Sequence, residues 1–96
     1  MSTYKFNSKD FYKKKDKQNE CCALTGIRLE PHTCDISHVV PLHKGGKHEY
    51  DNVQLIHKDL VKIARGLTND EILEYAIKIV ETLGKTKGFT IKRKSK

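Results

Sequence analysis

The run TCDISHVVP, residues 33–41, limits most strictly what this chain can fold into. It is rich in β-branched side chains and it alternates, with Ile36 and His38 on one side, so it predicts a β-strand over Thr33–Val40. Pro41 ends the run, because proline cannot donate a hydrogen bond to a sheet ladder. The chain is therefore expected to turn shortly after His38.

The residues that follow complete a hairpin and a helix. Gly45 and Gly46 let the backbone turn, and the apolar run Val53–Ile56 predicts a second short strand. Over Lys58–Arg65 the apolar residues fall on one helical face, and Gly66 follows where a C-cap is expected. The whole pattern is strand, loop, strand and helix, with the helix lying across the hairpin.

Two further helices are expected beside this unit. A short helix is predicted between Ser8 and Gln18, with Ser8 as its cap. A longer helix over Thr68–Leu83 begins with a capping box completed by Glu71 and carries an apolar stripe, so it is expected to cover the hairpin as part of the core. The segment Asn19–Thr33 is expected to hold turns and little regular structure.

The segment SHVVPLHKGGKHEYDNVQLIHKD, preceded by CALTG, resembles the core of HNH endonucleases. The joint spacing of a histidine, a proline, a glycine pair and an asparagine carries the resemblance, which covers roughly residues 20–83. It implies a small α+β fold with a ββα-metal core, an N-terminal short helix and a C-terminal covering helix. The chain then divides into a basic arm (1–19), an HNH-like domain (20–84) and a basic tail (85–96).

The resemblance implies an endonuclease that hydrolyses phosphodiester bonds, in DNA rather than RNA, and it assigns two catalytic residues. His38 matches the histidine that takes a proton from water, a task suited to a side chain that titrates near neutral pH. Asn52 matches the asparagine whose amide holds that imidazole in its working orientation. Basic side chains around the unit would grip the flanking phosphates: Lys44, Lys47, Lys62 and Arg65.

The chain departs from the family pattern at both positions that bind the metal. The acidic ligand before the histidine falls on Ser37, and the ligand on the helix falls on Val61. A serine hydroxyl is a weak ligand for Mg²⁺ or Mn²⁺, the ions that the resemblance implies, and valine has no ligand atom. Without the ion, the reaction would lose a large stabilisation of the charge that develops on the phosphate.

Two outcomes stay open from the residues alone. Asp35 lies one strand repeat before Ser37, and together with His57 and either His43 or His48 it could hold an ion at a shifted site. Alternatively, the domain is a catalytically degenerate relative that binds nucleic acid without cutting it.

The cysteines are few and badly spaced for cross-linking. Cys21, Cys22 and Cys34 make an odd count with two adjacent members, which is unsuited to a disulfide framework. No structural zinc is expected, because the predicted helix lacks the second cysteine pair that such a site needs.

The positive charge is concentrated at the two ends. The net charge of +7 divides into +4 for residues 1–17, −3 for residues 18–84 and +6 for residues 85–96. Basic arms around a small core are expected of a protein that binds nucleic acid, because each neutralised phosphate releases counterions. No apolar run is long enough to span a membrane, and no signal core begins the chain, so a soluble, intracellular protein is expected. It would lie in the cytoplasm, nucleoid or nucleus, and it could be encoded by a virus or a mobile element. Oligomeric state has no sequence signal.

Overall fold

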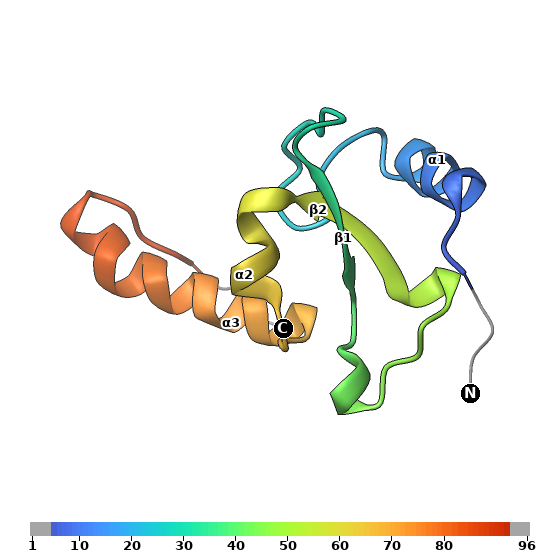
Figure 1. Ribbon diagram of the computed structural model, residues 1–96. Helices are drawn as coiled ribbons and strands as arrows, with labels where there is room; N and C mark the ends of the chain where they lie inside the picture. The colour runs from blue at the N-terminus through green and yellow to red at the C-terminus, as the bar shows by residue number, and fades with distance from the viewer. Residues whose placement is uncertain (1–4, 93–96) are drawn as a thin grey trace.

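The centre of the computed structural model, which describes residues 5–92, is a two-stranded antiparallel sheet (Figure 1). Strand β1 spans Cys34–His38 and strand β2 spans Val53–His57. They pair in register, from Cys34 opposite His57 at one end to His38 opposite Val53 at the other. The predicted hairpin is confirmed.

Strand β1 ends two residues earlier than predicted, because the side chain of Asn52 replaces a backbone carbonyl as the hydrogen-bond acceptor at Val40. Beyond His38, the N–H of Val39 donates to the carbonyl of Asn52 at 2.9 Å. The N–H of Val40 donates instead to the side-chain Oδ1 of Asn52, also at 2.9 Å. The backbone is thereby released from the sheet and enters the short helix η1, Leu42–Lys44.

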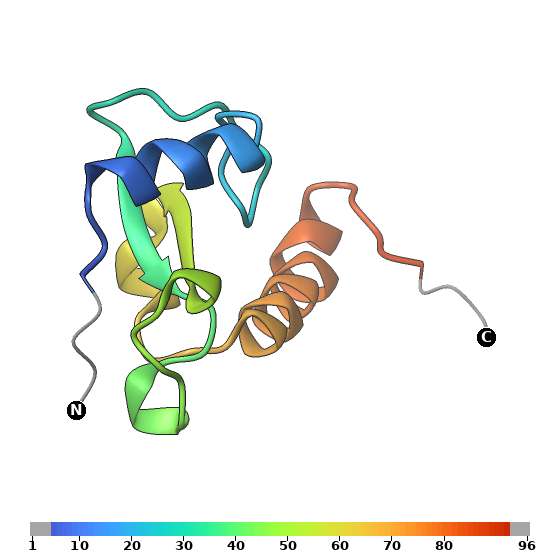
Figure 2. The same cartoon turned by 90° about the vertical axis from the view of Figure 1, so that its right-hand side faces the viewer.

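Helices lie on both faces of the hairpin. Helix α1 spans Ser8–Lys17, and the turn η3, Lys58–Leu60, leads from β2 directly into α2, Val61–Ala64. Two perpendicular views show α1 and α2 on opposite faces of the strands (Figures 1 and 2). The small α+β arrangement with a ββα unit is confirmed.

Helix α1 is fixed at both ends by amide side chains. Its cap is Asn7 and not Ser8 as predicted: Ser8 is already helical, and the Oδ1 of Asn7 accepts the N–H of Asp10 at 3.0 Å. At the other end, Gln18 Nε2 donates to the carbonyl of Leu55 and Gln18 Oε1 accepts its N–H, both at 3.0 Å. Gln18 therefore satisfies the edge of β2 as a neighbouring strand would.

The core is built around β2 on both of its faces. Side chains alternate along a strand, so Leu55 and Ile56, both fully buried, point to opposite sides of the sheet. The irregular segment before β1 contributes Leu29, which is 2% exposed. Phe11 of α1 packs against this cluster, and Ala64 of α2 belongs to it. The two helices are held by the same few residues.

Helix α3 spans Asn69–Ile79 and continues as a π-helical turn, η4, over Val80–Gly84. The predicted capping box is confirmed. The Oγ1 of Thr68 accepts the N–H of Glu71 at 3.1 Å, and a carboxylate oxygen of Glu71 accepts the N–H of Thr68 at 2.9 Å. The start of α3 is thus defined by its own sequence.

The prediction that α3 covers the hairpin is wrong. No residue of this helix is buried, and the apolar side chains of Leu73 and Ile79 are 59% and 56% exposed. Only Ile72, in the first turn, packs against the core. Five-residue strands span only about 17 Å, and α2 already packs on β1, so α3 runs past the sheet after its first turn (Figure 1).

The chain reverses its direction after helix α3 and η4. The N–H of Phe89 donates to the carbonyl of Gly84 at 2.8 Å, so the chain folds back at the end of η4. Residues 1–4 of the predicted basic arm and 93–96 of the predicted basic tail lie outside the described residues. Within 5–92, no helix has both the length and the apolar character needed to cross a membrane.

Candidate active site

His38, the last residue of β1, lines an open cavity of about 230 Å³. Ser37 and Val61 line the same cavity, so the two positions matched to metal ligands do lie beside this histidine in space. Arg65 adds a guanidinium group. The other lining residues are apolar side chains and a glycine: Ile36, Pro41, Leu42, Ala64 and Gly66. The cavity therefore offers an imidazole, a hydroxyl and a cation, and its lining contains no carboxylate.

His38 is paired with a second histidine. Its Nε2 lies 3.0 Å from Nδ1 of His48, and the two rings meet edge to face with their centroids 5.3 Å apart. In such a pair one ring nitrogen carries the hydrogen and the other accepts it, so at least one ring has to be neutral. Burial lowers the pKa of His38, and the charge of His48 lowers it further. Both effects favour the neutral imidazole of His38, which is the state a general base requires.

Asn52 acts on the loop after His38 and not directly on the imidazole, which corrects the expected contact. Its Nδ2 donates to the carbonyls of Val40 and Lys47, at 2.9 and 2.8 Å, and its Oδ1 accepts the N–H of Val40. Both amide hydrogens are used by backbone groups. The amide thus fixes the start and the middle of the loop that carries His48, and it positions the pair through the backbone.

The glycine pair of this loop has unequal roles. A Cβ built on Gly46 would lie 1.9 Å from the carbonyl oxygen of Val40 and 2.9 Å from Nδ2 of Asn52. A Cβ on Gly45 would meet nothing within 4 Å, and only the positive φ of 93° opposes a side chain there. Close backbone packing therefore requires glycine at position 46.

We expect Gly46→Ala to lower the free energy of unfolding by more than about 3 kcal/mol, because the backbone of Val40 and the Asn52 hydrogen bonds would have to move. Gly45→Ala is the matched control, and it should cost about 1–2 kcal/mol through left-handed backbone strain alone. Urea unfolding followed by circular dichroism measures both. Equal losses for the two variants would contradict the packing role of Gly46.

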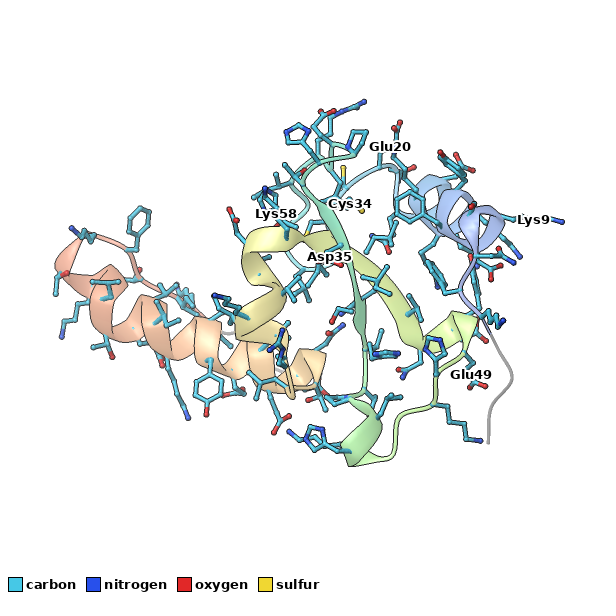
Figure 3. All side chains as sticks on the ribbon, in the orientation of Figure 1. Lys9, Glu20, Cys34, Asp35, Glu49 and Lys58 are labelled. Atoms are coloured by element: carbon cyan, nitrogen blue, oxygen red, sulfur yellow. The ribbon has the colours of Figure 1, made fainter. Side chains whose placement is uncertain are left out.

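The shifted metal site suggested by Asp35 and His57 is not assembled. Cross-strand partners share a face, and Asp35 pairs with Ile56 whereas His57 pairs with Cys34, so Asp35 and His57 point to opposite faces of the sheet. Their hydrogen bonds are local: a carboxylate oxygen of Asp35 accepts the N–H of Ile36, and Nδ1 of His57 accepts the N–H of Asp59. In Figure 3, Asp35 lies on β1, well away from the labelled Glu49, which belongs to the loop that follows β1.

The donor set does not fit a divalent ion. Over residues 5–92, no group of three or more histidine, cysteine, aspartate or glutamate side chains could hold a metal. At the positions matched to ligands, Ser37 offers one neutral oxygen and Val61 offers none, whereas Mg²⁺ and Mn²⁺ prefer carboxylate oxygens. The three cysteines are free thiols: Cys21, Cys22 and Cys34. The residues that line the cavity of His38 therefore supply no ligand set for a divalent ion.

The predicted phosphate-binding cations differ in their surroundings. Arg65 lines the cavity of His38, and the side chains of Lys47 and Lys62 are exposed. Lys44 is engaged: its Nζ lies 2.5 Å from a carboxylate oxygen of Glu71. That hydrogen bond lowers the pKa of Glu71 to about 2, and it ties η1 to the start of α3. Lys44 is thus a structural cation in this fold, and the other three remain candidates.

Residues 20–59 match the family model described as HNH endonuclease. The matched range contains both strands, with His38 at the end of β1, and the segment between them that carries His48 and Asn52. It ends before α2. The family resemblance predicted from the sequence is confirmed for this segment. No curated protein sequence matches the chain. An HNH segment indicates a nuclease-type or nucleic-acid-binding function.

Proposed function

We propose that this protein is a nuclease that hydrolyses phosphodiester bonds, those of DNA in preference to those of RNA. His38 acts as the general base. The observation that carries the proposal is the pair of His38 and His48 beside a cavity that Arg65 also lines, within a segment that matches the HNH endonuclease family. A neutral imidazole next to a cation is suited to activating water against a phosphate.

The reaction begins with a water molecule held by His38. His38 takes a proton from this water, and the oxygen attacks the phosphorus while the bond to the leaving sugar oxygen breaks; that oxygen takes a proton from solvent. His48, 3.0 Å away, holds the ring of His38 and shares the hydrogen between them. Arg65 is placed to donate to the phosphate oxygens, and exposed Lys47 and Lys62 would bind flanking phosphates.

The second candidate function is binding of nucleic acid without cleavage, and the residues of the cavity favour it. Ser37 and Val61 leave the cavity without the oxygen ligands of a divalent ion, and the described residues supply no replacement cluster. A protein with this defect would bind nucleic acid in a salt-sensitive manner without cutting it.

Cleavage and binding assays on the same protein separate the two functions. Supercoiled plasmid and a labelled RNA of similar length are incubated with Mg²⁺, Mn²⁺, Ni²⁺ or EDTA, and binding is followed in parallel by fluorescence anisotropy. The proposal expects slow nicking of the plasmid, and less cleavage of the RNA. Binding without cleavage under every condition would support the degenerate module instead.

The pH dependence of the rate follows from the state of His38. As a base it works only when neutral, so the rate falls as the pH drops through its pKa in the folded protein. Burial and the neighbouring His48 lower that pKa, so the acid limb of the rate profile should lie below the ordinary titration range of histidine. His48→Gln removes one of the two causes, and it should move the limb toward higher pH. A limb at the ordinary value in both proteins would contradict the assignment.

A further inference from the structure

Three lysines of α1 gather around one aromatic ring. The Nζ atoms of Lys13, Lys14 and Lys17 lie 5.0, 3.8 and 5.9 Å from the centroid of the Tyr50 ring. Tyr50 opens the short helix η2, Tyr50–Asn52, which is far from α1 in the sequence. The Nζ of Lys14 also donates to the carbonyl of Tyr50 at 2.9 Å. We call these four residues the lysine–tyrosine cluster.

The three amines of the cluster form no ion pair with a carboxylate of the described residues. None of them lies within 4.0 Å of such a group, although neighbouring Lys15 pairs with Glu20. Partial burial lowers the pKa of Lys14, and the charges of Lys17 and Lys13 lower it further, against opposing effects of Asp51 and Asp10. The ring face attracts the amines but has no net charge. An anion bound between them would relieve their repulsion.

The position of the cluster connects it to the histidine pair. Its Tyr50 follows His48 by two residues, and Asn52, two residues later, fixes the loop on which both stand. His48 in turn touches His38. A nucleic-acid strand with one phosphate at His38 would therefore present neighbouring phosphates along this loop.

We propose that the lysine–tyrosine cluster binds backbone phosphates of nucleic acid beside the His38–His48 pair. The inference rests on the proposed function, and it extends the site from the HNH segment to α1, which lies outside the matched residues. Lys13 and Lys17, one helical turn apart, supply the exposed cations. Lys14 holds the loop through the carbonyl of Tyr50 and is partly buried.

The test compares two variants of equal charge. The variant Lys13→Ala/Lys17→Ala removes two amines of the cluster. The control Lys58→Ala/Lys78→Ala removes two exposed lysines elsewhere. Figure 3 shows Lys58 on the other side of the hairpin from α1. Affinity for a fluorescent DNA duplex is measured by anisotropy in EDTA between 50 and 200 mM salt. Since each lost phosphate contact lowers the slope of log K against log salt by about 1, the cluster variant should lose about 2 and the control almost nothing. Thermal unfolding verifies that both variants are folded.

The outcomes distinguish this inference from the nuclease proposal. Equal slopes for the cluster variant and wild type, or equal losses in the two variants, overturn the phosphate site even if wild type cuts DNA. A slope loss confined to the cluster variant supports the site even if wild type does not cut. Absence of any salt-dependent binding by wild type overturns both.

Discussion

Ser37→Asp combined with Val61→Asn should convert this protein into a far more active, metal-dependent nuclease. Both side chains line the cavity of His38, so the new carboxylate and amide oxygens would lie beside the proposed base. Such oxygens are the ligands that Mg²⁺ and Mn²⁺ prefer. A bound ion that stabilises the transition state by about 3 kcal/mol raises the rate about a hundred-fold. We expect an increase of at least that order in plasmid nicking with Mn²⁺.

The control for this variant places the new charge outside the cavity. Ile27→Asp with Val61→Asn makes the same change of charge, but Ile27 is exposed and is not among the residues that line the cavity. Calorimetry with Mn²⁺ and the nicking rate are measured for both double variants. Tighter metal binding and faster nicking should appear only with the aspartate at position 37. A control that gains as much, or a Ser37 variant that gains nothing, would contradict the alignment of this cavity with the metal site.

The hairpin could be predicted because its signals are local. Alternation up to His38, the proline that follows and the glycine pair each act on the residues beside them. The capping box of Thr68 and Glu71 is local in the same sense, and it too is confirmed. By contrast, the apolar stripe on α3 shows that the helix has a face to bury, but it does not show whether another element lies close enough to cover that face. Among residues 5–92, the short strands and the position of α2 leave no such element beside α3, so the stripe is exposed.

The candidate site was predictable in part for the same reason. The family spacing points to His38, and the strand register brings Ser37 and its neighbours to the cavity. The contact of His48 with His38 depends on the path of the loop, which Asn52 fixes through backbone carbonyls that have no sequence signature. The separation of Asp35 from His57 depends on the pairing register, which only the folded hairpin defines.

His38→Ala should lower the rate of phosphodiester cleavage by about 10² to 10⁴, the usual contribution of a general base. His48→Ala should cost less, because His48 acts through His38 and the water can still be activated without it. DNA binding should be nearly unchanged in both, since neither imidazole supplies a fixed positive charge. His32→Ala, at an exposed position outside the cavity lining, is the matched control and should behave as wild type.

The most direct test of the catalytic role of His38 is the single-turnover rate at which excess protein nicks supercoiled plasmid, measured for wild type and His38→Ala at equal occupancy of the DNA. The proposal predicts measurable nicking by wild type and a rate at most about one hundredth of it for His38→Ala. Equal rates for the two proteins, including no nicking by either, would contradict it.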